Sequence, residues 1–361
     1  MTFQKEFTSM QSAINKFPLV SVVIPCRNEV DHIASCLSSI FDQDEVLGGF
    51  EVIVADGMSD DGTREILNQL TSVHDRLRVV DNPARITSTA LNSGIREARG
   101  RYIAIMGAHA HYARDYLKAS LRVSEQTSAD NVGGSMICVG NSALQKAIAA
   151  AHHSPFAVGG ARWHNAIYEG PADTVFGGFY RREIFDRIGL FDETLVRNQD
   201  DDLNFRLTLA GGKIWHSPRI KSWYHPRASL AAVFRQYLQY GYWKVRVIRK
   251  HGRPASIRHL VPALFVGGLL GLLALGFFST ISLWLALALI AAYCTCAVVA
   301  SALTAMRTDF RNFLTLLAVF PCYHFGYGVG FLRGVIDFIV LRRAPADSFT
   351  RLTRSKQPLR A

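Results

Sequence analysis

Three short polar clusters in the first part of the chain each follow an apolar run. They are Pro25-Cys26-Arg27-Asn28-Glu29, the stretch from Asp56 to Thr63, and Gly107-Ala108-His109-Ala110-His111. A carboxylate held in one place, such as that of Asp56, accepts hydrogen bonds from an imide N–H or a ribose hydroxyl, and the guanidinium of Arg27 can pair with a phosphate. Together these residue types predict a pocket for a nucleotide.

Two of these clusters also have a purely structural interpretation. The residues from Asp60 to Thr63 are best explained as a turn in which Asp61 or Thr63 caps the next helix. Asp56 precedes that cap, and its position at the end of an apolar run favours a binding role. Histidines are common in loops, so for His109 and His111 a ligand role and an ordinary loop role stay equally open.

Apolar runs and helical periodicities predict the elements that position the clusters. Strands are expected at 19–24, 50–54, 77–80 and 102–106, with helices between them that contain 30–41, 66–70 and 86–98. This alternation predicts an α/β fold with a doubly wound, mostly parallel sheet. In such a sheet, ligands bind beyond the carboxyl ends of the strands, which is where the clusters lie. Beyond Asp115 the pattern loosens into a mixed region, and we expect this region to shape the second substrate site.

The charge distribution divides the chain into two parts. The 361 residues include 40 Lys and Arg against 29 Asp and Glu, which gives a formal charge of +11. No Asp or Glu lies between Leu203 and Thr308, and no residue from Leu260 to Met306 carries a formal charge. This uncharged stretch is long enough for two bilayer crossings at roughly 20 residues each. The sequence therefore predicts a membrane protein with a large soluble head. Its composition excludes collagen, coiled-coil and disulfide scaffolds.

The apolar region is preceded by a basic, aromatic segment at 229–258, which suits the headgroup layer of a membrane. Spanning helices are expected at 260–278 and 281–306. A third apolar stretch, 313–341, contains Pro321, His324, Arg333 and Asp337. We expect two full spans and an interfacial or re-entrant third segment, with three spans and an external tail as the alternative. The N-terminus has no signal-peptide pattern, and the positive-inside rule places the basic tail at 342–361 in the cytoplasm. We expect a multi-pass inner-membrane protein whose head is cytoplasmic.

Five ordered motifs resemble those of family 2 glycosyltransferases: VSVVIPCRNE, VIVADGMSDDGT, ALNSGIREARGRYI, FGGFYRREIFDRIGLFDE and NQDDDLNFRL. The C-terminal apolar segments resemble the branch that builds bacterial exopolysaccharides, such as the succinoglycan glycosyltransferases. The resemblance implies a GT-A fold, with a Rossmann-like nucleotide-binding half and an acceptor half. It also implies a hexosyltransferase with a nucleotide-diphosphate sugar donor, a divalent metal and inversion at the anomeric carbon. The expected parts are an N-terminal extension at 1–17, a GT-A domain at 18–228, the interfacial segment, a membrane region at 259–341 and the basic tail.

The resemblance assigns roles to individual residues. Pro25, Arg27 and Glu29 match the family's first nucleotide motif, and Asp56 matches the acidic residue that contacts the base. Asn92 matches a helix position near the donor.

Asp200 falls at the position of the family's general base, with Asp201 beside it and Gln199 in place of the usual Glu. A sugar hydroxyl must lose its proton as it attacks, which requires such a carboxylate. The alternative is that Asp200 or Asp201 only caps the helix that carries Leu203.

The metal motif departs from the family pattern. The family has Asp-x-Asp or, in this branch, Asp-Ala-His, whereas this chain has Gly107-Ala108-His109. Gly107 offers no ligand, so the resemblance leaves His109, water and the donor oxygens to hold the cation. An imidazole ligand suits Mn²⁺ better than Mg²⁺. The loss of a carboxylate predicts weakened metal binding.

The sequence signal for an acceptor site is less specific than that for the donor site. The segment around Gln239 and Trp243 loosely resembles the Gln-x-x-Arg-Trp motif of processive enzymes, but an interfacial anchor explains it equally well. We expect transfer of one sugar, with a uridine-diphosphate sugar as the donor and a lipid-linked saccharide as the acceptor. The alternative is a catalytically silent nucleotide-sugar binding or scaffold protein. The positive charge collects beside the apolar segments, which argues against nucleic acid as a partner.

Overall fold

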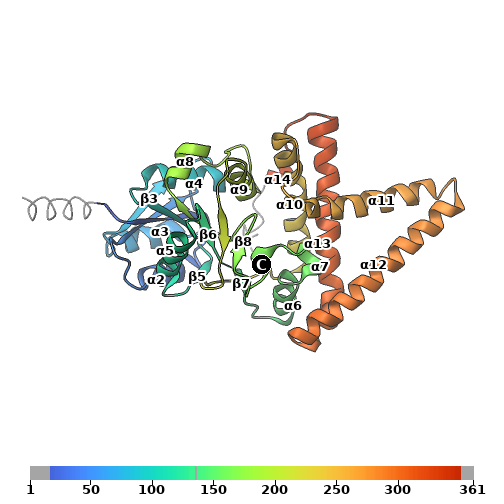
Figure 1. Ribbon diagram of the computed structural model, residues 1–361, viewed down its shortest axis with the longest axis horizontal. Helices are drawn as coiled ribbons and strands as arrows, with labels where there is room; N and C mark the ends of the chain where they lie inside the picture. The colour runs from blue at the N-terminus through green and yellow to red at the C-terminus, as the bar shows by residue number, and fades with distance from the viewer. Residues whose placement is uncertain (1–16, 135, 351–361) are drawn as a thin grey trace, which may run out of the picture. The chain divides into compact units, whose positions relative to one another are not determined.

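The computed structural model describes residues 17–134 and 136–350, shown in Figure 1. The chain forms two compact units. Of the described residues, the first unit, which we call the sheet unit, comprises 17–134, 136–137 and 165–224, and the second, the helical unit, comprises 138–164 and 225–350. The expected GT-A domain at 18–228 stays a prediction; within it, residues 138–164 belong to the helical unit. Most of the expected extension at 1–17 and the end of the tail, 351–361, lie outside the described residues.

The sheet unit is built on an eight-stranded mixed sheet in the order β3-β2-β1-β4-β9-β6-β10-β8. Strands β1, β2, β3 and β4 pair in parallel, β10 pairs in parallel with β6, and β9 runs antiparallel to β4 and β6. The first four are Val20–Cys26, Phe50–Asp56, Leu77–Asp81 and Tyr102–Ile105; the others are β6 Asn131–Gly133, β8 Gly170–Pro171, β9 Phe179–Arg181 and β10 Ile214–His216. The predicted strands and the mostly parallel α/β fold are confirmed.

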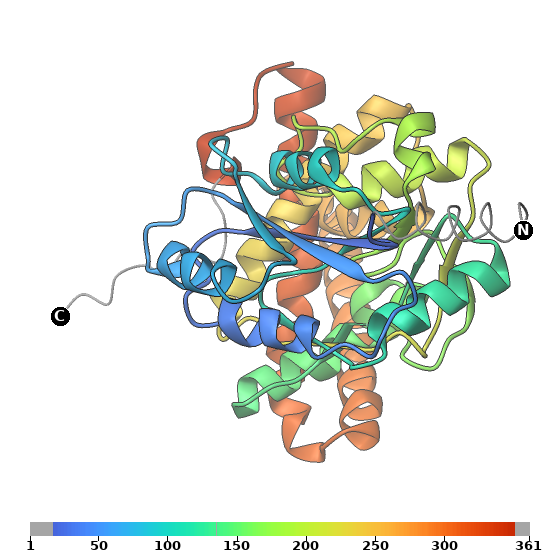
Figure 2. The same ribbon diagram turned by 90° about the vertical axis from the view of Figure 1, so that its left-hand side faces the viewer.

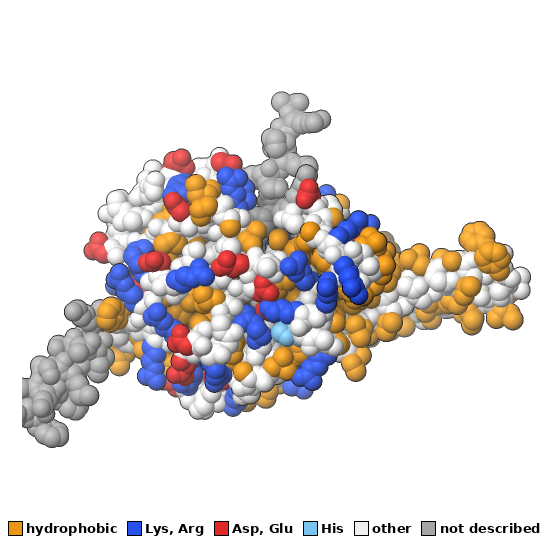
Figure 3. All heavy atoms as spheres, turned by 90° about the horizontal axis from the view of Figure 1, so that it is seen from above, with side chains coloured by type: hydrophobic (Ala, Val, Ile, Leu, Met, Phe, Trp, Pro, Cys, Tyr) orange, Lys and Arg blue, Asp and Glu red, His pale blue; other side chains and the backbone are white. Residues whose placement is uncertain are grey.

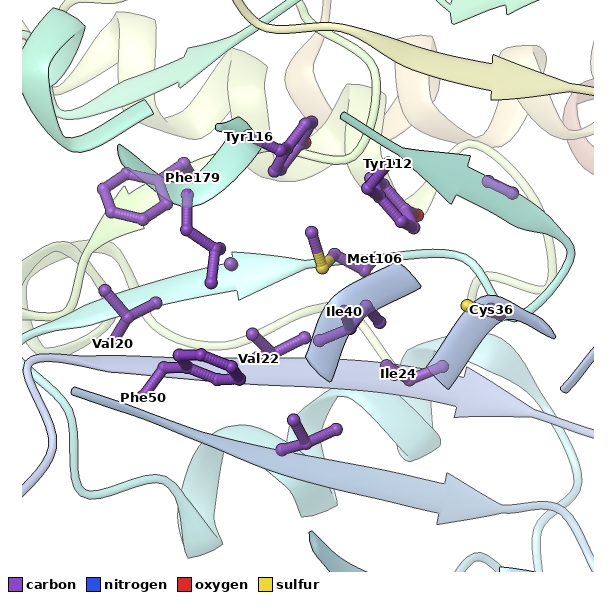
Figure 4. Close-up of a cluster of buried hydrophobic side chains, with 14 of the residues drawn as sticks. Val20, Val22, Ile24, Cys36, Ile40, Phe50, Met106, Tyr112, Tyr116 and Phe179 are labelled. Atoms are coloured by element: carbon purple, nitrogen blue, oxygen red, sulfur yellow. The ribbon is translucent and has the colours of Figure 1, made fainter. Parts of the chain in front are cut away.

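Helices cover both faces of this sheet (Figure 2). Alternate residues of β1 divide between two cores, because successive side chains of a strand point to opposite faces. Val22 joins the core that contains residues of α2 (Ile33–Phe41), α3 (Thr63–Thr71) and α5 (Tyr116–Thr127). Val23 joins the core that contains residues of α4 (Thr87–Glu97), α8 (Glu183–Ile188) and α9 (Gln199–Leu209). Figure 4 shows part of the first core, including Ile24, Cys36, Met106 and Tyr112, which lie just beneath the strand ends.

A small three-stranded sheet has the order β5-β11-β7. Its strands are Ala110–Tyr112, Ser222–Tyr224 and Met136–Cys138. Tyr224 lies opposite Ala110 in the antiparallel register of β5 and β11. This pairing brings β11 beside the third polar cluster of the sequence.

The helical unit contains the apolar part of the chain. Its long helices are α10 (Leu230–His251), α11 (Val261–Leu275), α12 (Thr280–Arg307) and α13 (Phe313–Gly334), and a π-helical turn at Val335–Val340 extends α13. Its short helices are α6 (Ala143–His152), α7 (Pro155–Val158) and α14 (Asp347–Thr350), with 3₁₀ turns at 162–164, 257–259 and 310–312. The segments 257–275, 280–307 and 310–340 are long and apolar enough to cross a membrane. Many hydrophobic side chains are exposed along the α11–α12 hairpin (Figure 3).

Candidate active site

The polar clusters that follow β1 and β2 are joined by hydrogen bonds. The Gly57 N–H donates to the carbonyl of Cys26 over 2.8 Å, and the side-chain amide of Asn28 donates to Asp60 over 2.8 Å. The Glu29 N–H donates to the hydroxyl of Thr63 over 2.8 Å. The two strands end side by side, so a few short bonds fix both loops. The predicted meeting of these clusters at one edge of the sheet is present.

Asp56 is fully buried at the end of β2 and already has polar partners. Its carboxylate accepts hydrogen bonds from the main chain and hydroxyl of Ser59, and it forms an ion pair of 3.0 Å with Arg64. Arg64 also pairs with Asp81 at the end of β3. The carboxylate that was expected to contact a base is thus held rigidly and partly neutralised by a cation from α3.

The helix cap that the sequence suggested for Asp61 or Thr63 is wrong in position. Gly62 takes the N-cap position of α3 with φ of 99°, a left-handed conformation that favours glycine. Asp61 instead accepts hydrogen bonds from the Thr63 N–H over 3.0 Å and from the Val30 N–H over 3.2 Å. Burial alone would raise the pKa of Asp61, but hydrogen bonds from Thr63 and Val30 outweigh it and lower that pKa.

The third cluster meets the first through Glu29 and His109. The Nδ1 atom of His109 lies 3.0 Å from Oε1 of Glu29, and the two side chains are 26% and 11% exposed. The Tyr224 ring packs against the imidazole in an edge-type arrangement, with 5.5 Å between ring centroids. An ionised Glu29 requires the proton on Nδ1, so the lone pair of the imidazole is then on Nε2. This arrangement orients a histidine at the carboxyl end of β4.

Gly107 lies in a fixed turn that nevertheless has room for a side chain. Its N–H donates to the hydroxyl of Tyr112 over 2.6 Å, and its carbonyl accepts from the Cys36 thiol. A Cβ added to Gly107 would have the Tyr112 hydroxyl at 3.9 Å as its nearest neighbour, which is ordinary contact. The absence of a carboxylate here is therefore not imposed by packing. Burial raises the pKa of the Cys36 thiol to about 12, so this thiol stays protonated and is not a nucleophile.

Pro25 and Arg27 frame the first loop. Pro25 lies opposite Ala55 in the β1–β2 register, beyond the part of β1 that pairs with β4. A residue without an N–H is tolerated there because the ladder with β4 has ended. Arg27 packs over Gly57, where an added Cβ would approach the Arg27 Cβ to 3.1 Å. A larger residue at 57 would displace the guanidinium that we expect to meet a phosphate.

Asn92 is buried on α4, and its amide is engaged by the chain that leads to α9. It accepts from the Phe191 N–H over 2.9 Å, and it donates to the Phe191 carbonyl over 2.9 Å and to Glu193 over 2.8 Å. These contacts make Asn92 a tether for residues 191–193. Its expected contact with the donor stays a prediction.

Asp200 and Asp201 lie in the first turn of α9, with Asp200 exposed and Asp201 half-buried. The N-cap position belongs to Asn198, so the alternative in which either aspartate caps the helix is wrong. Burial, and then the negative charge of Asp200, raise the pKa of Tyr180 in β9. Negative charge at a helix N-terminus is favourable, which suits carboxylates in the first turn of α9.

Asp202 differs from its two neighbours. It is fully buried and pairs with Arg206 over 3.0 Å, one turn along α9. Arg206 in turn donates to the carbonyls of Ile188, Gly189 and Leu190. This pair fixes the loop before α9, so it sets the position of Asp200 and Asp201 without facing a substrate.

Sequence reasoning missed Arg64, Tyr224 and Arg206. Arg206 follows Asp202 by one turn of helix, so an i,i+4 search would have found it. Arg64 lies eight residues after Asp56, and no helical spacing links the two. Nothing in the sequence links Tyr224 to His109, because that contact depends on the pairing of β5 with β11.

The residues present fit a metal ion only in a limited way. Among the residues that the structure describes, no group of three or more His, Cys, Asp and Glu side chains is arranged to hold a metal. His109, oriented by Glu29, fits a cation that takes most of its ligands from a bound diphosphate. The described side chains do not by themselves form a site that would bind a metal ion without the donor.

Comparisons with known proteins agree with this geometry. Residues 21–189 match the family described as Glycosyl transferase family 2. The chain is 35% identical over 243 residues to the succinoglycan biosynthesis protein ExoA of Rhizobium meliloti, covering 67% of this chain and 73% of that protein. It is 28% identical over 238 residues to a dolichyl N-acetyl-α-D-glucosaminyl phosphate 3-β-D-2,3-diacetamido-2,3-dideoxy-β-D-glucuronosyltransferase of Methanococcus voltae, covering 64% and 74% of the two chains.

A solved structure shares the fold. The mannosyltransferase PcManGT from Pyrobaculum calidifontis, in complex with GDP-Man and Mn²⁺, aligns with a TM-score of 0.56 and 21% identity over 88% of each chain. The sheet unit therefore has the GT-A arrangement.

Proposed function

The chain belongs to glycosyl transferase family 2, and from this we propose that it transfers a hexosyl group from a nucleotide-diphosphate sugar to a lipid-linked saccharide, with inversion at the anomeric carbon. The observation that carries the proposal is the meeting of three polar loops at the ends of β1, β2 and β4, where Glu29 holds His109. Ligands of open α/β sheets bind at this edge.

The donor nucleotide occupies the loops after β1 and β2. Asp56 accepts from the base, while Arg27 pairs with the diphosphate, as their chemistry and positions allow. Pro25 and Glu29 shape the same loop. We expect a uridine-diphosphate sugar, although the GDP-Man complex of PcManGT makes GDP-mannose a donor to include in any panel.

Asp200 acts as the general base, and Asp201 is the second candidate for that role. The acceptor oxygen attacks the anomeric carbon, the bond from that carbon to the diphosphate oxygen breaks, and its electron pair leaves with the nucleoside diphosphate. The proton of the acceptor hydroxyl passes to Asp200. One direct displacement inverts the configuration at the anomeric carbon.

A divalent cation bound beside His109 would neutralise the leaving diphosphate. The chain itself contributes an imidazole and, behind it, the carboxylate that orients it. Because Gly107 supplies no carboxylate, we propose that the cation enters with the donor and binds weakly without it.

The acceptor is proposed to be lipid-linked because the chain carries three segments long and apolar enough to cross a membrane. The relative named for succinoglycan biosynthesis supports an exopolysaccharide or other cell-surface glycan as the product. We place the protein in the inner membrane, with the sheet unit in the cytoplasm, where nucleotide sugars are made.

The test is transfer of labelled sugar into a membrane lipid extract by the full-length protein, from a panel of UDP- and GDP-sugars. The proposal predicts label in the lipid fraction from at least one donor, with the opposite anomeric configuration by NMR. Retained configuration would refute inversion.

A second candidate function is a catalytically silent nucleotide-sugar binding protein of a polysaccharide assembly complex. The observation that favours it is Gly107 at the metal motif. This candidate predicts nucleotide binding without release of nucleoside diphosphate.

A further inference from the structure

The third apolar segment, residues 310–340, differs from the other two in its surroundings. In the most apolar window of this segment 39% of the residues are buried, against 17% for 257–275 and 11% for 280–307. Length and composition alone permit all three to cross a bilayer. Whether the third segment crosses a bilayer therefore depends on the elements that pack against it.

Helix α10 lies in backbone contact along α13. A Cβ added to Gly330 would lie 2.0 Å from the carbonyl oxygen of Leu238, and a Cβ on Gly326 would lie 2.8 Å from that of Phe234. From the other side, a Cβ on Gly241 would lie 2.0 Å from the carbonyl oxygen of Tyr327. Glycines on both helices therefore allow this close approach, and the two helices run in the same direction. Because the two helices are in backbone contact, α10 must lie at the same depth in a membrane as α13.

Helix α10 is unsuited to the hydrocarbon layer. Arg235 is exposed and directly follows Phe234, whose carbonyl faces Gly326 near the middle of the third apolar segment. Gln239 and Lys244 follow on the same helix, and its last turn contains Arg249, Lys250 and His251. Charged side chains at mid-bilayer are costly. If α13 crossed the bilayer, the charged side chains in the middle of α10 would lie in its hydrocarbon layer.

The middle of α13 also binds a segment that cannot cross. The Nε2 atom of His324 lies 2.8 Å from the carbonyl oxygen of Phe156 in α7. In the chain, residues 138–164 are flanked by β7 and β8, and their helices α6 and α7 are too short to cross a bilayer, so both ends of this segment lie on one side of a membrane. Val319 and Phe320 of α13 pack with Ile148 of α6 in one buried cluster.

The end of α13 is charged as well. Asp337 is fully buried and pairs with Arg333 and Arg343, whose side chains are each 45% exposed. The hydroxyl of Tyr242 on α10 donates to the same carboxylate over 2.9 Å. Half-exposed guanidinium groups at this point suit the headgroup region of a membrane.

Another face of α13 is exposed and mostly apolar, although it also carries the half-exposed Arg333. Leu314, Val329, Ile336 and Val340 are 74%, 40%, 45% and 68% exposed. Their spacings are close to whole numbers of helical turns, so the four side chains lie on one face of the helix. A helix that packs on the basic helix α10 and has an exposed, mostly apolar face is typical of an interfacial position.

We propose that α13 lies in the plane of the membrane, with Leu314, Val329, Ile336 and Val340 against the acyl chains of one leaflet and α10, α6 and α7 on its other face. Among the described helices, α11 and α12 then cross the membrane. Ala344 lies on the same side of the membrane as the sheet unit. The partner of this surface is the interfacial layer of a lipid bilayer. The inference does not depend on the proposed chemistry.

The first test is the depth of nitroxide labels in the full-length protein reconstituted into phospholipid vesicles. Labels at Leu314, Val329 and Val340 should have equal accessibility to oxygen and to a nickel chelate. Labels at Ile281, Cys294 and Met306 of α12 are the internal control, where Cys294 should be the deepest. A Val329 label much deeper than both of its partners would overturn the proposal.

The second test is sidedness, read with a membrane-impermeant maleimide on single-cysteine variants in sealed vesicles. Arg311→Cys and Ala344→Cys should react from the same side, and Phe278→Cys, in the α11–α12 turn, should react from the other. Reaction of Arg311→Cys and Ala344→Cys from opposite sides would show that α13 crosses. If the cysteine-free background does not fold, a C-terminal reporter fusion on the natural chain gives the same readout.

Discussion

Oε1 of Glu29 and Nδ1 of His109 lie 3.0 Å apart, although 80 residues separate them in the chain. The contact joins the loop after β1 to the loop after β4, because these strands are neighbours in the sheet. It assigns Glu29 a positioning role toward the histidine, beyond the nucleotide contact that its motif implies. Because the contact occupies Nδ1, a metal ion would bind His109 through Nε2.

Glu29→Gln should weaken the effect of Mn²⁺ on nucleotide binding. Partners that orient a metal-binding histidine are typically worth 10–100-fold in metal affinity, and we expect a loss of about that size. Calorimetry of a nucleoside diphosphate with and without Mn²⁺ measures it, with the exposed Glu65→Gln on α3 as the control. An equal loss with and without Mn²⁺ would mean that Glu29 acts on the nucleotide alone.

Gly107→Asp should restore metal affinity without loss of stability. The nearest atom to an added Cβ is 3.9 Å away, so the side chain has room. We expect Mn²⁺ to bind about tenfold more tightly or better, which corresponds to about 1.4 kcal/mol. Titration followed by Mn²⁺ electron paramagnetic resonance measures this. Gly107→Asn is the matched control, and equal affinities in the two variants would contradict a charge effect.

Arg64→Met should destabilise the protein because it leaves the buried carboxylate of Asp56 without its cation. Arg64 is 32% exposed, so we expect a cost of about 1–3 kcal/mol, less than for a fully buried pair. Combining it with Asp56→Asn should recover part of that cost, with a coupling of about 0.5–3 kcal/mol. Thermal unfolding of the detergent-solubilised chain measures the cycle, with Arg122→Met on α5 as the control. Strict additivity would contradict the pairing.

Asp61→Asn should lose stability in a pH-dependent way. The pKa of Asp61 is lowered in the folded protein, so its carboxylate stabilises the fold above the unfolded pKa of about 4. That contribution disappears as the pH falls through the lower folded value. The difference in unfolding midpoint between wild type and variant should therefore be largest near pH 7 and shrink below about pH 4. A difference that grows on acidification would contradict this.

Much of the fold and part of the site could be predicted from sequence. The apolar runs before Pro25, Asp56 and Gly107 predicted parallel strands, and the rule for strand ends then predicted that their loops meet. That inference needs only the order of neighbouring elements, which local patterns carry.

The remainder depends on long-range contacts that no local pattern encodes. The ion pair of Arg64 with Asp56 depends on the rotation of α3, and the tether of Asn92 to Phe191 depends on the packing of two distant segments. The departure of residues 138–164 to the helical unit was not predicted either. Their apolar residues pack with α13, and this preference is invisible until both elements are folded.

The most direct test of the central claim is sugar transfer by wild type and Asp200→Asn, with nucleotide binding measured on the same preparations. The matched control is Asp186→Asn, an exposed aspartate in the first turn of α8. Loss of a general base typically costs 10²–10⁴-fold, so transfer should fall at least about 100-fold in Asp200→Asn while binding and the control stay unchanged. Equal transfer by wild type and Asp200→Asn, or nucleotide binding without any transfer by wild type, would contradict the account.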